Sequence, residues 1–298
     1  MDRPRVALTG FAPPAKLLRR ALELEGTFAE RASRSARVVV KPNVTYPRPS
    51  GTGAVTDNRV LEALLGLLRD CGAGQIVIGD GPGKSGAFEG FEAAGYLPLK
   101  ERFDVRFVDL NTARTRTVDV PRHRAFERLE IPTVILDADL FISISPLKTH
   151  VDGLLTLNAK NMFGVPPKRF YGWPVAIFHL YGVNETVHDI CRAAPVDYAI
   201  ADATVAMELG VARGRAVPIG AVVAGANLVA TDAVSARLIG QNPHACPYLA
   251  YLHEDGEGPL ALDEIELVGD PLEALARPLR LEFKRSPRAW ADGEPFEW

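Results

Sequence analysis

The chain has 298 residues, of which 47% are hydrophobic and 24% charged, as in a globular protein with a sizeable core. Its formal net charge of −3 argues against general nucleic-acid binding, which needs a basic face. The apolar runs are shorter than the ~18–20 residues of a membrane helix, and no apolar leader follows Met1. We therefore expect a cytoplasmic protein with no membrane or nucleic-acid partner.

The cysteines are few and far apart. Cys71, Cys191 and Cys246 form no CxxC pair. This spacing favours reduced, buried thiols over a disulfide framework or an iron–sulfur cluster.

The first third of the chain alternates between short apolar runs and helical patterns. Strands are expected at Arg5–Gly10, Arg37–Val40, Gln75–Gly79 and Val105–Val108, and helices at Pro14–Gly26, Asn58–Cys71 and Ala87–Ala94. Thr56-Asp57 would cap the second helix, and the Pro/Gly-rich residues 47–53 would form a loop. This order predicts an α/β fold with a mainly parallel sheet flanked by helices.

The middle of the chain begins with a more polar stretch, residues 112–130, which we interpret as a hairpin or excursion. A short turn over residues 133–139 follows. The apolar run Leu140–Ile144 then predicts a buried strand that ends at Pro146. Residues 165–174 are too rich in proline and aromatic residues for a regular element, and they are expected to form a lid or substrate-facing loop.

The last third continues the alternation. Helices are expected over Phe178–Arg192, from Thr231-Asp232 to Leu238, and over Leu249–His253. Strands are expected over Val196–Ile200, ending at Asp202, over Ala221–Ala224 and over Ile265–Val268. The tail from Arg277 to Trp298 is expected to dock on the surface through Trp290 and Trp298. The whole chain, residues 1–298, is expected to be one α/β unit. Two lobes, about 1–135 and 136–298, would share a central cleft.

The most informative stretch follows the buried strand at Leu140–Ile144. Lys148 and His150 come where this strand should end, and Lys160 and Asn161 follow ten residues later. In open α/β sheets, ligands bind outside the carboxyl ends of the strands. The cluster is therefore the first candidate for a site.

These residues resemble a known family, the bacterial and archaeal domain of unknown function 362. The resemblance covers roughly Val38 to Gly258 and is carried by an ordered set of motifs: Lys41-Pro42-Asn43, Thr56-Asp57, Asp80-Gly81, Pro146-x-Lys148-x-His150, Lys160-Asn161-x-Phe163-Gly164, His179, Asp202 with Glu208, and Asp232-Ala233. Many relatives carry an added segment with four-cysteine runs. This chain lacks that segment, so the resemblance does not imply an iron–sulfur cluster here.

Lysines and amides are the candidate substrate-binding residues. Lys41, Lys148 and Lys160 converging on one sheet edge would form a cationic pocket for a carboxylate or phosphate. Asn43 and Asn161 would add amide donors. In the alternative interpretation, each lysine pairs with an aspartate and only holds loops together.

Histidines and carboxylates are the candidates for chemistry. We assign catalytic roles to Lys148, His150 and His179, with an imidazole as general base. Together with the histidines, Asp80, Asp202 and Asp232 could instead hold a divalent metal, although no HxxxH or HxH spacing supports this. Structural histidines and helix-capping aspartates, above all Asp57 and Asp232, are the plainer interpretations.

Other cofactor motifs are absent or incomplete. Gly83-Lys84-Ser85 follows a predicted strand, but the glycine spacing of a phosphate-binding loop is not met. No Gly-x-Gly-x-x-Gly follows the first strand, so NAD is not expected. Three hypotheses remain: an enzyme acting on a small anionic metabolite with His/Asp acid–base or metal chemistry, a non-catalytic small-molecule or metal-binding protein, and a redox partner. The sequence names no reaction and no oligomeric state.

Overall fold

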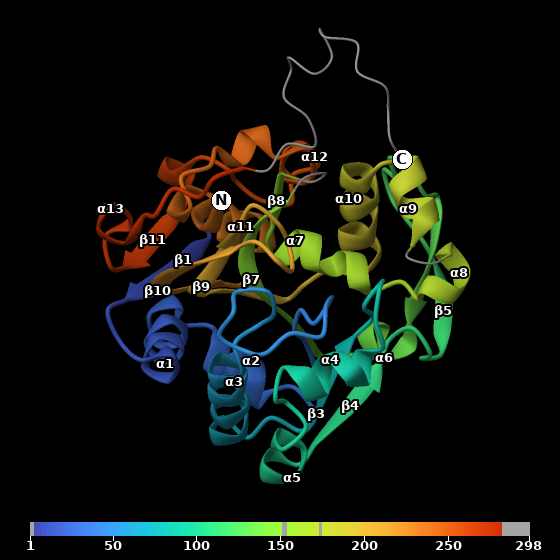
Figure 1. The fold of residues 1–298 in the computed structure, drawn as a ribbon, viewed down its shortest axis with the longest axis horizontal. Coiled ribbons are helices and arrows are strands. Elements are labelled where there is room, and N and C mark those ends of the chain that lie inside the picture. The colour runs from blue at the N-terminus through green and yellow to red at the C-terminus, as the bar shows by residue number, and fades with distance from the viewer. Residues whose placement is uncertain (1–2, 151–153, 173–174, 282–298) are drawn as a thin grey trace, which may run out of the picture.

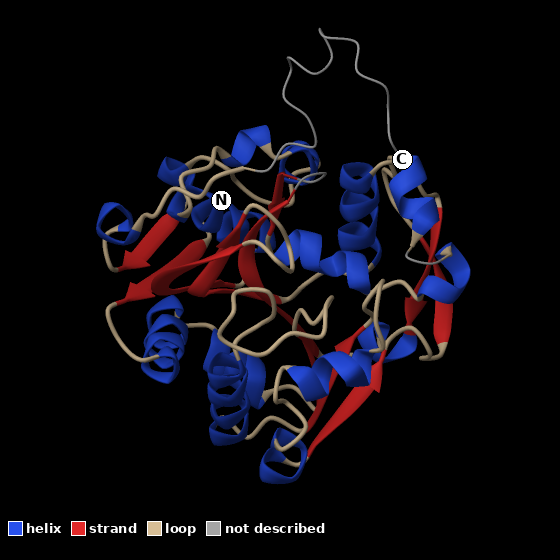
Figure 2. Cartoon of the chain, in the orientation of Figure 1, coloured by secondary structure: helices blue, strands red, loops and turns tan. Residues whose placement is uncertain are grey.

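A single sheet runs through the centre of the computed structural model, which describes residues 3–150, 154–172 and 175–281 (Figures 1 and 2). In spatial order its strands are β11 (Glu266–Gly269), β1 (Arg5–Gly10), β10 (Arg215–Gly225), β9 (Tyr198–Glu208), β7 (Leu140–His150), β2 (Arg37–Lys41), β3 (Gln75–Asp80) and β4 (Val105–Asp109), with β8 (Leu154–Thr156) paired to β7.

The sheet is mainly parallel, as the alternation of strands and helices predicts. Neighbours from β9 through β7, β2 and β3 to β4 pair in parallel, and β1 pairs in parallel with β11. The antiparallel pairs involve β10, which lies between β9 and β1, and β8. β1 therefore lies among strands from the far end of the chain and not beside β2.

Helices cover both faces of the sheet (Figure 1). One face packs against α1 (Pro14–Glu25), α2 (Phe28–Ser33), α3 (Asn58–Asp70), α4 (Ala87–Ala93) and α5 (Leu99–Phe103). The other packs against α7 (Asn158–Asn161), α10 (Val183–Ala193), α11 (Leu228–Leu238), α12 (Pro247–Glu254) and α13 (Leu272–Leu275). The described residues also form the short helices α6 (Thr133–Leu136), α8 (Lys168–Tyr171) and α9 (Ala176–Tyr181). Short 3-10 turns lie at Met162–Gly164, Pro243–Ala245 and Leu262–Glu264.

The two faces bury two separate hydrophobic cores, because side chains alternate along a strand. In β2, Val38 and Val40 belong to the core under α1 and α3, whereas Val39 belongs to the opposite core. All three are essentially inaccessible to solvent. This burial on both faces explains the uninterrupted valine run of a central parallel strand.

The hairpin expected over residues 112–130 is present. β5 (Thr115–Asp119) and β6 (Arg128–Pro132) form a two-stranded antiparallel sheet apart from the main one. Helix α3 also begins as predicted, because the Asp57 side chain accepts a hydrogen bond from the Arg59 N–H.

The central strand is longer than predicted. β7 does not end at Pro146 but continues to His150, so that Lys148 and His150 lie within the strand. The register with β9 shifts between Pro146 and Lys148, and such an irregularity tolerates the missing N–H of proline. Beyond it, β8 pairs with the extension, with Lys148 opposite Thr156.

Other boundaries also differ from the predictions, among them that of β10, which begins at Arg215 and not at Ala221. Asp202 lies inside β9, which runs on to Glu208. The helix expected over residues 178–192 is divided into α9 and α10 at Gly182, whose φ of 103° interrupts a helix. α11 begins at Leu228, where the Asn227 side chain accepts from the Ala230 N–H, so Asp232 is inside the helix and does not cap it.

Two predictions lie partly outside the described residues. Residues 165–174 were expected to lack a regular element, yet α8 forms over four of them, and residues 173–174 are outside the described part. Residues 282–298, which include Trp290 and Trp298, are outside it as well.

Candidate functional site

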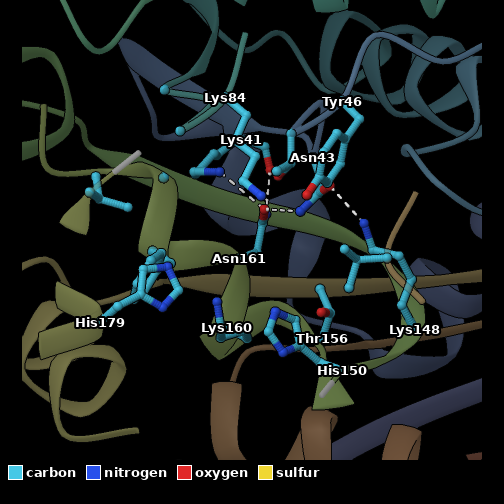
Figure 3. Close-up of a pocket in the computed structure, with 17 residues that line it drawn as sticks. Lys41, Asn43, Tyr46, Lys84, Lys148, His150, Thr156, Lys160, Asn161 and His179 are labelled. Atoms are coloured by element: carbon cyan, nitrogen blue, oxygen red, sulfur yellow. Dashed lines mark hydrogen bonds between the residues drawn. The ribbon is translucent and has the colours of Figure 1, made fainter. Parts of the chain in front are cut away.

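A cavity of about 570 Å³ lies where the carboxyl ends of β2 and β3 and the extension of β7 meet (Figure 3). Loops and short helices close its sides. Its described walls consist of Lys41, Asn43, Thr45, Tyr46, Gly81, Gly83, Lys84, Lys148, His150, Thr156, Lys160, Asn161, Phe163, Gly164, Val175, His179 and Val211.

The structure brings together every residue that the sequence assigns to catalysis or substrate binding. These seven residues come from three separate regions of the sequence, and all of them line this cavity: Lys41, Asn43, Lys148, His150, Lys160, Asn161 and His179. Their roles stay predictions, because the placement by itself shows no reaction.

Lys41 and Asp80 form a buried ion pair at the ends of β2 and β3. The Lys41 Nζ lies 2.6 Å from Asp80 Oδ1, and both side chains are at most 2% exposed. Asp80 also accepts hydrogen bonds from the backbone N–H groups of Val44 and Gly81. Burial lowers the pKa of Lys41, and the Asp80 carboxylate acts in the opposite direction. Lys41 therefore matches one of the plainer interpretations, a lysine paired with an aspartate.

Gly164, the last residue of the Lys160-Asn161-x-Phe163-Gly164 motif, packs directly on this ion pair. A Cβ atom at this position would lie 2.9 Å from Asp80 Oδ1 and 3.2 Å from Lys41 Nζ. The motif needs a glycine here for a steric reason.

Asn161 connects the strands to α7 through its side-chain amide. Its Oδ1 accepts from Lys41 Nζ at 3.0 Å and from Asn43 Nδ2 at 3.1 Å. Its Nδ2 donates to the Lys41 carbonyl and to Ser143 Oγ, both at 3.1 Å. All of its usual hydrogen-bonding positions are thus engaged within the protein, and Asn161 fixes the wall of the cavity.

Lys148 fastens the two ends of a loop. Its Nζ donates to Asn43 Oδ1 at 3.0 Å and to the Ala54 carbonyl at 2.8 Å, and these residues flank residues 44–53. The side chain is 1% exposed. Burial lowers the pKa of Lys148 to about 7, and the nearby charge of Lys160 adds to the effect. At neutral pH this amine is therefore an equilibrium mixture of charged and neutral forms.

Lys160, His150 and His179 lie along another side of the cavity (Figure 3). The Lys160 Nζ is 3.9 Å from the centre of the Phe163 ring, and the His179 ring lies 5.6 Å from the same ring. Phe163 thus positions both a cation and an imidazole.

The charges on the described walls have one sign. Four lysines and two histidines line the cavity, and none of its described wall residues is an aspartate or glutamate. The Asp80 carboxylate compensates Lys41 from behind the wall. The side chains that line the described walls therefore include several bases and no acid.

The three aspartates assigned to a metal lie behind the walls, where they accept hydrogen bonds from protein donors. Asp202 accepts from the Asp57 N–H and from the N–H and hydroxyl of Thr204, and burial raises its pKa to about 6. Asp232 accepts from the N–H groups of Asn158 and Ala159, which begin α7, and burial raises its pKa to about 7. These two carboxyls organise the backbone around the site.

The described residues contain no group of three or more His, Cys, Asp or Glu side chains that could hold a metal ion. Asp80, Asp202 and Asp232 therefore do not form a shared metal centre with each other. Glu208 is buried as well, and it accepts from Arg215 and from the Arg280 N–H. None of the three cysteines forms a disulfide, and Cys71 is only partly buried, contrary to the expectation for it.

Sequence reasoning missed several wall residues. Tyr46 directly precedes the proline- and glycine-rich residues 47–53 and belongs to no motif. Lys84 belongs to the Gly83-Lys84-Ser85 run, which was set aside because it failed the spacing of a phosphate-binding loop. The position of this run directly after β3 was the feature of the sequence that could have identified Lys84 as a wall residue.

The model of the family described as "Domain of unknown function (DUF362)" matches residues 38–237, which is most of the chain. The chain belongs to this family. The match begins at β2, as the motifs indicated, and ends within α11, short of Gly258.

Two individual proteins are similar to this family member. The thylakoid-associated protein sll1697 of Synechocystis sp. (strain ATCC 27184 / PCC 6803 / Kazusa) is 27% identical over 253 residues, which cover 83% of this chain and 76% of that protein. The lactate racemase apoprotein from Thermoanaerobacterium thermosaccharolyticum is 17% identical, with a TM-score of 0.49; the match covers 78% of this chain and 57% of that one. In the described part of the chain, no helix has the length and apolar character needed to cross a bilayer.

Proposed function

We propose that the protein is an enzyme that acts on a small anionic metabolite, a carboxylate or a phosphate, bound in this cavity. The observation that supports the proposal is the one-sided charge of the described walls, with four lysines, two histidines and no carboxylate. A concave site with convergent cations concentrates and orients an anion.

The walls also supply groups that can move a proton. His150 and His179 carry imidazoles, whose ordinary pKa lies close to physiological pH. Lys148, with its pKa lowered to about 7, can accept a proton at neutral pH, as an ordinary lysine cannot. In this proposal Lys160 holds the anion, and the histidines and Lys148 transfer protons beside it.

Anion binding is the first test. Calorimetry with sulfate, phosphate and acetate should detect binding of at least one of them. Lys160→Ala should weaken that binding about tenfold, since it removes one close charge–charge contact. Lys100→Ala, which removes an exposed lysine on α5, is the matched control. If none of the three anions binds or raises the melting temperature, the proposal is wrong.

A non-catalytic binding protein is the second candidate, and one observation favours it. The amine of Lys148 already has two acceptors, Asn43 and Ala54, which gives it a structural task. Incubation of a panel of carboxylates in D₂O distinguishes the two functions. If a carbon-bound hydrogen of one carboxylate exchanges with solvent, and His150→Ala abolishes this exchange, the protein is an enzyme. Binding without exchange across the whole panel favours the binding protein.

The cytoplasmic location expected from the sequence stays part of the proposal. Fractionation of cells that produce the full chain, followed by immunodetection in the soluble and membrane fractions, would test it.

A further inference from the structure

A second, more open cavity adjoins the first. The two share Tyr46 and Val211 in their walls. The other residues that line the outer cavity are Pro47, Arg48, Leu209, Gly210, Ala212 and Arg213. A ligand that extends out of the inner cavity past Tyr46 and Val211 would enter this outer space.

Two arginines define the chemistry of the outer cavity. Arg48 and Arg213 come from separate loops, and no aspartate or glutamate is among the described residues that line this space. Within residues 3–150, 154–172 and 175–281, neither guanidinium forms an ion pair or a side-chain hydrogen bond. Two guanidiniums beside one cavity, without a carboxylate partner in the described part, favour an anionic group on a ligand.

Both loops are anchored to the strand that carries the inner site. Lys148 holds the two ends of the loop with Arg48 through Asn43 and Ala54. The other loop is held where the Leu209 N–H donates to the Thr149 hydroxyl at 3.0 Å. Thr149 is the neighbour of Lys148 in β7, so one strand of the inner cavity contacts both arginine loops.

We propose that the ligand is an elongated organic dianion, with one anionic group in the inner cavity and the other between Arg48 and Arg213. This inference rests on the proposed function and deepens it. The inner group meets Lys160, the outer group accepts from the two guanidiniums, and an apolar middle section passes Tyr46 and Val211.

A series of straight-chain dicarboxylates, from malonate to sebacate, provides the probes. Each is compared by calorimetry with the monocarboxylate of equal chain length. Short members of both series should bind with similar affinity. Beyond a threshold length the dicarboxylate should bind about tenfold more tightly, because its second carboxylate then reaches the arginines.

Variants assign this gain to the outer cavity. Arg48→Gln with Arg213→Gln should remove the advantage of the long dicarboxylate and leave short monocarboxylates unchanged. The control Arg106→Gln with Arg114→Gln removes the same charge from two exposed arginines that line neither cavity, and it should preserve the advantage.

Two failures are distinguishable. In the first, short anions bind in a Lys160-dependent manner, but dicarboxylates bind no more tightly than monocarboxylates at any length, or their higher affinity survives the loss of both arginines. This result overturns the elongated dianion and leaves the proposed function standing. If no anion of any length binds, both are overturned.

Discussion

Lys148 is buried beside Lys41 and Lys160, and among the described residues its amine donates to the neutral oxygens of Asn43 and Ala54. A neutral amine has two N–H groups, as many as these two acceptors require. Loss of the third proton therefore need not break the contacts that hold residues 44–53. This explains how a lysine can keep a structural contact and still change its charge near neutral pH.

Anion binding should therefore be coupled to proton uptake. At pH 8 the Lys148 amine, with its pKa of about 7, is mostly neutral, and a bound anion favours its protonated form. Calorimetry of sulfate binding in two buffers of different ionisation enthalpy should show uptake of a proton. Lys148→Met should abolish that uptake. Equal heats in both buffers for the unaltered protein would contradict the prediction, and uptake that survives in Lys148→Met would assign it to a histidine.

The same pKa sets the direction of a pH effect on stability. The folded pKa of Lys148 is lowered from 10.5 to about 7, so the unfolded chain binds more protons between these values. The free energy of unfolding of the unaltered protein, relative to Lys148→Met, should rise as the pH increases from about 7 to about 10.5. Urea titrations at several pH values measure it, and a difference that is constant or falls with pH would refute the assignment.

At the scale of elements, the short helix α7 is held by a residue distant in sequence. Asp232, inside α11, accepts from the first two N–H groups of α7 and from the Asn158 side chain. Asp232→Ala would leave these buried donors without an acceptor, at a cost of about 3 kcal/mol of unfolding free energy. Because α7 carries Lys160 and Asn161, anion affinity should fall as well.

Urea unfolding and calorimetry together test this role of Asp232. Asp263→Ala removes an exposed aspartate and should change neither quantity. A stable Asp232→Ala variant with full anion affinity would show that α7 does not depend on this carboxylate.

The elements that the sequence predicts best are those with local signals. Asp57 followed by a leucine stripe places α3, and the valine run of β2 places a buried strand. The errors occur where tertiary contacts decide. Pro146 suggests a strand end, but the irregular pairing with β9 and the added β8 carry β7 on to His150. Asp202 was predicted to end a strand and Asp232 to begin a helix, whereas both lie inside their elements and accept hydrogen bonds from other segments.

The asparagines, the histidines and three of the four lysines that line the cavity were named from the sequence, because motifs mark them, whereas Lys84 was missed. Its outer part was not predicted, because Tyr46 and Arg48 reach the cavity walls through a loop whose path depends on tertiary contacts with Asp80 and Lys148.

For the molecule as a whole, the place of β1 ties the two expected lobes together. Val6 lies opposite both Gly225 of β10 and Leu267 of β11, so a cut near residue 135 separates β1 from both of its neighbours. A fragment of residues 1–135 alone should show no cooperative thermal unfolding by circular dichroism. Co-expression with residues 136–298 should restore a cooperative transition. A fragment 1–135 that melts cooperatively by itself would contradict this dependence.

The position of β1 in the sheet also determines when the sheet can be completed during synthesis. Among the described strands β1 is synthesised before the others, yet its hydrogen-bonding partners, β10 and β11, are the last of them to be made. The apolar residues of β1, Val6, Ala7 and Leu8, therefore stay without strand partners until β10 and β11 have been synthesised. Such non-local pairing slows folding and prolongs the exposure of a strand edge. The final closure of the sheet, and not the assembly of β2, β3 and β4, should set the folding rate of this protein.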